Sequence, residues 1–342
     1  MSHQPLIASL HSFAYYVPSK VITNEYLSNL LDVSPEWIFE RSGVLERRYV
    51  EDNQSTSDIA MQCLNNMKDK YQTNFEDIDI IIAATLSSDY YFPGIAPIIQ
   101  NKLGISKQIP CLDIRTQCAS FPYILETAQA YVALGKYKKV LVVCADVQSK
   151  NLDFTPDGKN VTMLFGDGAS AFIVEKNTEN SEEQNSINGI IDTIIRADGS
   201  GVLSLYNPMP GTSHVGHIDF KNINSKDRYP NMDGRSVFKN AVTYFKEVTQ
   251  EIMTRNNINI EEIDHFIFHQ ANLRIIETVA AQLKIDPKKI FNNIEKFGNT
   301  TSATVGICLA EATEKGIIKK GDLILTSAFG TGFMWGSSLF RI

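Results

Sequence analysis

An internal repeat limits what this chain of 342 residues can fold into more than any other feature of its sequence. Residues 76–82 read EDIDIII and residues 261–267 read EEIDHFI, so each copy has an acidic turn that leads into a run of β-forming residues. A helical stretch follows each run and ends in a related signature, LGI at 103–105 and LKI at 283–285. The repeat predicts two copies of one supersecondary unit, packed about a pseudo-twofold axis.

The best-matched part of the repeat begins at Cys118 in the first copy and at Asn299 in the second. Each of these residues opens a stretch with apolar residues at helical spacing. Both stretches end after the same number of residues, at Gly135 and Gly316, where glycine suits the end of a helix. Cys118 and Asn299 are therefore expected at equivalent helix N-termini, and the duplication predicts that folding brings them to one site.

The strands predicted around these helices give the fold class. Residues 138–147 (KKVLVVCADV) and 319–330 (KKGDLILTSAFG) contain the β-branched runs that are typical of buried strands, and a glycine-rich turn into a further strand follows each. This strand–helix alternation predicts an α/β fold of two pseudo-duplicated βαβαβ-type halves. The predicted limits are 1–176 for the N-terminal half, 177–186 for a polar connector and 187–342 for the C-terminal half.

Charge and composition exclude several classes of protein. A net charge of -7 argues against non-specific binding to nucleic acid. No apolar run approaches the 18 or so residues of a membrane span, and the N-terminus lacks the basic and apolar segments of a signal peptide. The five cysteines are an odd number and none forms a CxxC pair, which predicts free thiols in a reducing cytoplasm.

Cys118 differs from the other cysteines because it follows a predicted buried strand, CLDIRT, and begins a helix. The positive end of a helix dipole and its free N–H groups lower the pKa of a thiol and favour the nucleophilic thiolate. A free cysteine is otherwise a small core residue, and that interpretation is preferred for Cys63, Cys111, Cys144 and Cys308. On position alone, a functional role for Cys118 is as well supported as a structural one.

His269 and Asn299 are ordinary residues when each is taken alone. His269 ends the run IDHFIFHQAN, and a histidine at the end of a strand is more often structural or simply exposed. Asn299 lies in FGNTTSATVG, where asparagine is a frequent helix cap. Only their combination with Cys118 points to chemistry.

The combination resembles the β-ketoacyl-acyl-carrier-protein synthase III family of thiolase-like condensing enzymes. The similarity spans nearly the whole chain in the family's order, and it is carried by WIFERSGVLERRYV (37–50), FGDGASA (165–171), MDGRSVFKNAV (232–242), HQANLRII (269–276), GNTTSA (298–303) and FGTGFMWGSSLFRI (329–342). The resemblance implies the thiolase-like fold in five αβαβα layers, a homodimer, and a catalytic triad of Cys118, His269 and Asn299.

The reaction that this resemblance implies has two steps. The Cys118 thiolate takes an acyl group from acyl-CoA or an acyl-carrier protein, while the backbone N–H groups of Cys118 and Thr331 stabilise the oxyanion. A malonyl thioester, expected as malonyl-carrier protein, then loses CO2, and His269 and Asn299 donate hydrogen bonds to the enolate. The enolate attacks the acyl-cysteine. This chemistry needs no metal and no cofactor, because the CoA and carrier thioesters are themselves the substrates.

Further residues are assigned to substrate handling by the same resemblance. Trp37 and Arg41 match positions that flank the CoA adenine, and the indole offers a face for stacking. Phe92 matches a residue that closes the acyl pocket of the neighbouring subunit. The remaining assignments are Phe165 as a residue lining that pocket, Asn272 as a substrate contact and Arg274 as part of a carrier-protein docking surface. Each also has an ordinary interpretation, as core packing or as a solvated helix charge.

Several positions depart from the family's pattern. Lys159 stands near the place of an arginine, and the two are not equivalent at a stacked site, which puts CoA recognition in question. Thr331 replaces a glycine and is expected to narrow the pocket, and Gln148 replaces an apolar pocket residue. Residues 204–231 form a polar insertion that could cap the substrate entrance. Its His214 and His217 have zinc-like spacing, but a structural or solvated role is preferred.

Two other functions stay open on the sequence. The first is an acyltransferase or specialised-pathway ketosynthase that joins the Cys118-bound acyl group to another nucleophile. The second is an inactive partner subunit that stabilises an active paralogue, although such subunits usually lose a triad residue and this chain keeps all three. If Cys118 is acylated and CO2 is then released, the chain is a condensing enzyme, and neither a simple acyltransferase nor an inactive subunit.

Overall fold

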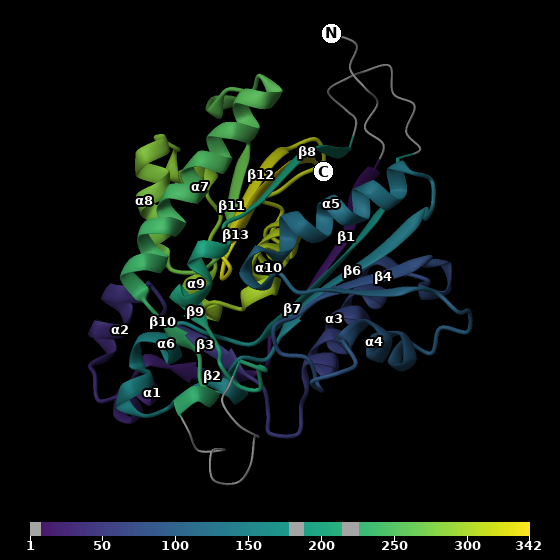
Figure 1. The fold of residues 1–342 in the computed structure, drawn as a ribbon. Coiled ribbons are helices and arrows are strands. Elements are labelled where there is room, and N and C mark those ends of the chain that lie inside the picture. Colours follow the sequence, from purple (N-terminus) through teal and green to yellow (C-terminus); the bar gives the residue numbers. More distant parts are fainter. Residues whose placement is uncertain (1–7, 178–187, 214–225) are drawn as a thin grey trace.

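The computed structural model describes residues 8–177, 188–213 and 226–342, so nearly all of the predicted connector lies outside the described residues, as do His214 and His217. Figure 1 shows two β-sheets with helices between them and on their outer faces. None of the helices in the described ranges is long and apolar enough to cross a membrane. The domain limits proposed from the sequence stay a prediction.

The sheet of the N-terminal half has five strands in the order β1-β7-β6-β4-β5. β4 pairs in parallel with β5 and β6, whereas β7 pairs antiparallel with β1 and β6. The strands are β1 (Ala8–Tyr16), β4 (Ile80–Ala84), β5 (Cys111–Ile114), β6 (Lys139–Asp146) and β7 (Gly168–Lys176).

The sheet of the C-terminal half repeats this topology in the order β8-β13-β12-β11. Its one parallel pair, β11 and β12, corresponds to β4 and β6, and an isolated parallel bridge from Phe266 to Ile290 lies where β5 lies in the first sheet. The predicted duplication is therefore present in the strand order. The strands are β8 (Gly189–Ala197), β11 (His265–Phe268), β12 (Leu323–Gly330) and β13 (Met334–Arg341).

Helices separate and cover the two sheets, which gives the five layers (Figure 1). α5 and α10 lie between the sheets, α3 and α4 cover the outer face of the first, and α7 and α8 cover the second. Almost every residue of α10 is buried, as expected of a helix that is apolar all round. The helices are α3 (Thr56–Tyr71), α4 (Ile95–Leu103), α5 (Ser120–Ala133), α7 (Gly234–Asn256), α8 (Leu273–Leu283) and α10 (Thr304–Glu314).

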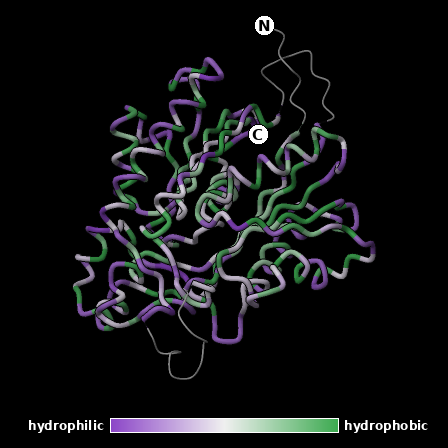
Figure 2. The backbone as a smooth tube through the Cα atoms, viewed as in Figure 1, coloured by the Kyte–Doolittle hydropathy of each residue, from purple (hydrophilic) through white to green (hydrophobic). Residues whose placement is uncertain are grey.

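Hydropathy follows this layering. Figure 2 shows apolar residues along both sheets and polar residues along the outer turns and helix surfaces. Within the described residues there are four apolar cores: one around the central helices, one beneath each outer pair of helices, and a smaller one that includes Leu27, Leu31 and Phe165. The first three residues of each central helix, 120–122 and 304–306, are buried, so both N-terminal ends are held between the sheets.

Short elements beside one end of the sheets surround the site. They include the two-stranded antiparallel sheet of β2 and β3 and the two-stranded sheet of β9 and β10, and the latter joins the two ends of the 204–231 insertion. The buried guanidinium of Arg47 ties this region together by donating to the Ile22 carbonyl, Asn24 Oδ1 and the Met163 carbonyl. The elements are α1 (Asn24–Leu31), α2 (Pro35–Ser42), α6 (Lys159–Thr162), α9 (Ile294–Phe297), β2 (Lys20–Thr23), β3 (Glu46–Tyr49), β9 (Leu205–Tyr206) and β10 (Asn231–Met232).

One prediction about the strands is wrong. The CLDIRT segment was predicted to be a buried strand, but three residues of β5 are only partly buried and Asp113 is exposed. The reason is that β5 lies at the edge of its sheet and has a neighbouring strand on one side only. Periodicity alone does not distinguish an apolar edge strand from a central one.

Candidate active site

Cys118 lies in a tight turn between β5 and α5. The turn is a 3-10 helix, Gln117–Ala119, and Gln117 has a positive φ of 47°. The corresponding turn before α10 is the 3-10 helix Thr301–Ala303, which also begins at a residue with a positive φ, Thr301 at 49°. Both halves therefore use the same turn before a central helix. Cys118 lies within its turn, but Asn299 lies two residues before its own, so the prediction that both residues begin equivalent helices is wrong for Asn299.

The turn after β12 lies directly against the nucleophile candidate. A Cβ on Gly330 would lie 3.0 Å from Cys118 Cβ and 3.1 Å from the Cys118 nitrogen, so a larger residue there would push against the backbone at Cys118. This close contact places Thr331, the second predicted oxyanion-hole residue, on the same wall of the site. The Thr331 hydroxyl donates a hydrogen bond to the Leu205 carbonyl, which ties this turn to the base of the 204–231 insertion.

His269 follows β11 and is almost fully buried. Its backbone N–H donates to the Ser327 carbonyl at 2.9 Å, and its Nδ1 lies 2.6 Å from Thr304 Oγ1. No atom of the described residues pairs with Nε2. The ring is therefore fixed through one nitrogen, while the other is left for a group that enters the site.

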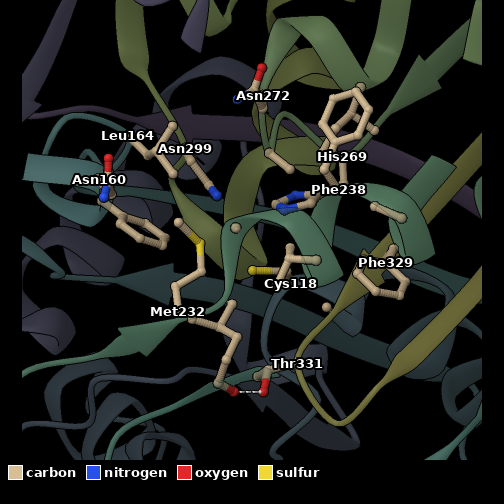
Figure 3. Close-up of a pocket in the computed structure, with 18 of the residues that line it drawn as sticks. Cys118, Asn160, Leu164, Met232, Phe238, His269, Asn272, Asn299, Phe329 and Thr331 are labelled. Atoms are coloured by element: carbon tan, nitrogen blue, oxygen red, sulfur yellow. Dashed lines mark hydrogen bonds between the residues drawn. The ribbon is translucent and has the colours of Figure 1, made fainter. Parts of the chain in front are cut away.

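Asn299 is also buried, and its amide has a defined orientation. Its Oδ1 accepts a hydrogen bond from the Thr301 N–H at 2.9 Å. Because the oxygen is engaged, the amide nitrogen is the group that faces the site, and Figure 3 shows it directed toward the cavity. Asn299 can therefore act there as a hydrogen-bond donor.

One cavity of about 390 Å³ collects these residues from both halves (Figure 3). Cys118, His269 and Asn299 all line it, as the sequence predicts, and so do Thr331 and Asn272. The rest of the wall is mainly apolar and includes Met163, Leu164, Phe165, Leu205, Met232, Val237, Phe238, Ile275, Phe329 and Phe333. A largely apolar cavity with a few polar groups suits a ligand that is mostly uncharged and carries one reactive group.

The protonation states differ from the sequence-based prediction. Burial, with a further contribution from the nearby carboxylate of Asp146, raises the pKa of Cys118 to about 12. Burial lowers the pKa of His269 to about 3. The prediction of a lowered thiol pKa is thus wrong for the empty site, because desolvation outweighs the helix terminus. The resting pair is a neutral thiol and a neutral imidazole.

This protonation state predicts how the thiol reacts with a reagent that brings no base. At pH 7 only about one thiol in 10⁵ is ionised when its pKa is near 12, and the fraction grows about tenfold per pH unit. We expect the rate at which iodoacetamide alkylates Cys118 to rise about tenfold per unit from pH 7 to pH 9, as measured by peptide mass spectrometry. A plateau near neutral pH would show that the thiolate already exists in the free protein.

The predicted adenine-binding residues lie outside this cavity. The Arg41 guanidinium lies 4.2 Å from the centre of the Trp37 ring, and the Lys159 ammonium lies 5.9 Å from it. Lys159 therefore lies beside the indole, as expected of a substitute for the family's arginine. A flat ligand that stacks on Trp37 would meet cationic groups around the ring.

Two polar residues at the start of α8 are already engaged within the chain. Asn272 caps the helix through its Oδ1, and its Nδ2 donates to the Arg41 carbonyl at 2.9 Å. Arg274 donates to the carbonyls of Phe39 and Glu40 and forms an ion pair with Glu277. Both side chains connect α8 to α2, and the docking role of Arg274 stays a prediction.

The predicted pocket residues are found in different environments. Phe165 is buried and lines the cavity, whereas Phe92 is 79% exposed on a loop after β4 and does not line it. Gln148 is buried behind the site and does not line this cavity either. Within the described residues, no group of histidine, cysteine and carboxylate side chains could hold a metal ion.

Sequence reasoning missed Thr304 and Arg235. Thr304 begins α10 and holds His269, but nothing in the motif GNTTSATVG marks that hydroxyl as a histidine partner. Arg235 is the single charged residue in the described lining, and within the described residues its guanidinium forms no hydrogen bond or ion pair. The one feature of the sequence that could have pointed to Arg235 is its place in the family-like stretch MDGRSVFKNAV.

Two duplicated α/β halves that place a cysteine, a histidine and an asparagine around one cavity define the class of thiolase-like condensing enzymes. Residues 112–199 match the family described as 3-oxoacyl-[acyl-carrier-protein (ACP)] synthase III, and residues 253–342 match its C-terminal part. The chain belongs to this family.

Individual relatives agree along nearly the whole chain. The β-ketoacyl-[acyl-carrier-protein] synthase III of Fusobacterium nucleatum is 37% identical and covers 97% of this chain and 98% of its own. That of Phocaeicola vulgatus is 38% identical, with 94% and 92% covered. The crystal structure of 3-oxoacyl-[acyl-carrier-protein] synthase III from Aquifex aeolicus superposes with a TM-score of 0.86 at 34% identity, covering 98% and 100%. The protein is a condensing acyltransferase of this type.

Proposed function

We propose that this enzyme transfers an acyl group from a CoA or carrier-protein thioester to Cys118 and condenses it with a malonyl-carrier protein by decarboxylation. The observation that supports this most is the meeting of Cys118, His269 and Asn299 on one apolar cavity. A thiol attacks the acyl thioester, and two hydrogen-bond sources then face the place where an enolate would form. The relatives' names point to the same carrier-linked chemistry.

The shape of the cavity supports a substrate with a pantetheine arm. Apolar residues line its length, and Arg235 is the single cation among them within the described residues. The phosphopantetheine arm of CoA and of carrier proteins is mostly uncharged along its length and ends in a phosphate, which a guanidinium binds well. We therefore assign Arg235 to that phosphate. Trp37, Arg41 and Lys159 would lie beyond it, where the nucleotide of CoA would extend.

Replacing Arg235 with glutamine tests this assignment. A charge-assisted hydrogen bond is worth about 1.5–3 kcal/mol, so we expect kcat/KM to fall about tenfold or more for an acyl-CoA. An acyl-pantetheine, which lacks the phosphate, should lose little. Lys239→Gln on the same helix is the matched control, since Lys239 does not line the cavity. Equal losses with both substrates would contradict the assignment.

We also propose that the enzyme works as a homodimer. Phe92 is 79% exposed next to Tyr90 and Tyr91, which are also exposed, and this is unusual for three consecutive aromatic residues. β5 is an edge strand with one open side. Both features fit a second copy that covers them and receives Phe92 in its acyl pocket. Analytical ultracentrifugation tests this, and a monomer at micromolar concentration would contradict it.

The proposed location is the cytoplasm, because all five cysteines are free. The proposed reaction uses no metal and no cofactor beyond its thioester substrates. A condensation assay with acyl-CoA and malonyl-carrier protein tests the whole proposal. A β-ketoacyl product and CO2 in equal amounts are expected, and acyl transfer without release of CO2 would instead favour a simple acyltransferase.

A further inference from the structure

The hydrogen bonds around His269 define which of its nitrogens carries a proton. Thr304 Oγ1 lies 2.6 Å from His269 Nδ1 and 3.2 Å from the Thr301 carbonyl oxygen. A carbonyl can only accept, so the one hydroxyl hydrogen of Thr304 is donated to Thr301. Oγ1 then accepts the Nδ1–H of the ring. A neutral imidazole has a single N–H, and Nε2 is therefore left with a lone pair.

The unpaired nitrogen faces the site where the reaction takes place. Nε2 is buried, has no partner within the described residues, and belongs to a residue that lines the cavity with Cys118 and Asn299. Buried polar atoms in folded proteins nearly always have a hydrogen-bond partner, so a buried acceptor without one points to a group that enters the site. A group that arrives with a proton, such as the Cys118 thiol during attack, would satisfy it.

The turn that carries Thr304 is held firmly. The backbone N–H of Ser302 donates to Asp146 Oδ2 at 3.0 Å, and the Ser302 hydroxyl donates to the same oxygen at 2.5 Å. Asp146 itself is fixed at the end of β6 by the Leu86 N–H at 2.6 Å. The orientation of the Thr304 hydroxyl therefore follows from a buried network that links both halves.

We infer that Thr304 is a positioning residue that fixes His269 as the Nδ1–H tautomer, so that Nε2 carries the Cys118 proton from one half-reaction to the other. This inference rests on the proposed function for its use of the two half-reactions. The tautomer itself rests on assigning the Thr304 hydroxyl hydrogen to the Thr301 carbonyl, and not on the proposed function.

The proton balances over the cycle. In the first half-reaction the sulfur of Cys118 bonds to the acyl carbon, the S–H proton moves to Nε2, and the bond to the leaving thiolate breaks. That thiolate takes its proton from water. In the second, the malonyl thioester loses CO2, and Nε2–H and the Asn299 amide stabilise the enolate oxygen. The enolate carbon bonds to the acyl carbon, the bond to Cys118 breaks, and the thiolate recovers the proton from Nε2.

The acyl-enzyme therefore holds a charged imidazole that the empty site disfavours. Thr304 Oγ1 stabilises this charge by accepting Nδ1–H. The carboxylate of the malonyl group brings a negative charge into the same cavity, which compensates the imidazolium when it is formed. Without the acceptor at Thr304, the His269 ring would no longer be held in one orientation and its positive charge would be less stabilised.

Nitrogen NMR of the wild-type protein labelled with ¹⁵N-histidine tests the tautomer directly, with His269→Asn used to assign the signal. We expect the chemical shift and proton coupling of Nδ1–H and of a bare Nε2. A signal for Nε2–H with a bare Nδ1 would overturn the inference. This result does not depend on whether the enzyme condenses its substrates, so failure of the proposed function would be seen separately in the assay.

Kinetics of two variants test the role of the hydroxyl. Thr304→Val keeps the shape but removes the acceptor, and we expect kcat to fall at least about tenfold in both half-reactions with KM little changed. Thr304→Ser keeps the hydroxyl and should restore most of the rate. A valine variant that folds and turns over like wild type would overturn the role. If the valine variant does not fold, the NMR measurement on the wild type and the kinetics of Thr304→Ser still test the role of the hydroxyl.

Discussion

Replacing Cys118 with alanine is expected to abolish the acyl-enzyme and to lower the rate of condensation by at least about 10⁴-fold. Removing a catalytic nucleophile commonly costs this much or more, because the remaining groups only bind and polarise the substrate. The fold should persist, since Cys118 makes no side-chain hydrogen bond among the described residues and alanine fits the same turn. Intact-mass spectra after exposure to an acyl-CoA measure the first effect, and product formation measures the second.

Cys111→Ala is the matched control for this variant. Cys111 lies on β5, a few residues before the nucleophile candidate, and it is half-buried rather than part of the cavity. It should keep both the mass adduct and the activity. If the Cys118→Ala variant were still acylated, or if the Cys111→Ala variant were no longer acylated, Cys118 would not be the nucleophile.

Replacing Asn299 with alanine is expected to slow the decarboxylation step by about 10²–10³-fold and to leave acylation of Cys118 nearly unchanged. The amide donor faces the cavity, and loss of one donor to a developing oxyanion typically costs this much in a site that excludes water. The two steps are measured separately, as single-turnover acylation by an acyl-CoA and as release of CO2 from a malonyl thioester.

The same two measurements, of acylation and of CO2 release, distinguish the role of His269 from that of Asn299. His269→Ala should slow both steps, because Nε2 takes the Cys118 proton in the first and donates in the second. Asn160→Ala is a control and should change neither step as much, since Asn160 lines the cavity but is not one of the three proposed catalytic residues. Equal slowing of acylation by Asn299→Ala and His269→Ala would contradict the division of roles that we assign.

The sequence alone predicted the duplication and the meeting of distant residues. Equal spacing from Cys118 to Gly135 and from Asn299 to Gly316 corresponds to two central helices that end at glycines with positive φ. That pattern is local, because helix caps and apolar periodicity depend on neighbouring residues. The pairing of Cys118 with Asn299 then followed from symmetry. The place of His269 followed only from the family resemblance.

Other features could not be predicted, because they depend on what surrounds a residue in space. The helix terminus at Cys118 favours a thiolate, but burial by residues from both halves outweighs it. Nothing in the sequence indicated that the Arg274 guanidinium donates to carbonyls of α2, and its docking role stays a prediction. The hydroxyl of Thr304 is close to His269 in the fold but 35 residues away in the chain. Periodicity carries no signal for such contacts.

The structure connects two of the departures from the family's pattern, Thr331 and the 204–231 insertion. Thr331 lines the cavity, and its hydroxyl donates a hydrogen bond to the Leu205 carbonyl at the base of the 204–231 insertion; that it narrows the pocket stays a prediction. Leu205 and Met232 flank this insertion and line the cavity. The insertion is thus joined to the cavity wall at both ends, within the described residues.

The most direct test of the account is a single turnover followed in two stages by mass spectrometry and CO2 detection. Wild-type enzyme is loaded with an acyl-CoA, freed of excess substrate, and mixed with malonyl-carrier protein. The account predicts one acyl group on the peptide that contains Cys118, which then disappears as one CO2 and one β-ketoacyl product form per group. An acyl group on another residue, or its loss without release of CO2, would contradict it.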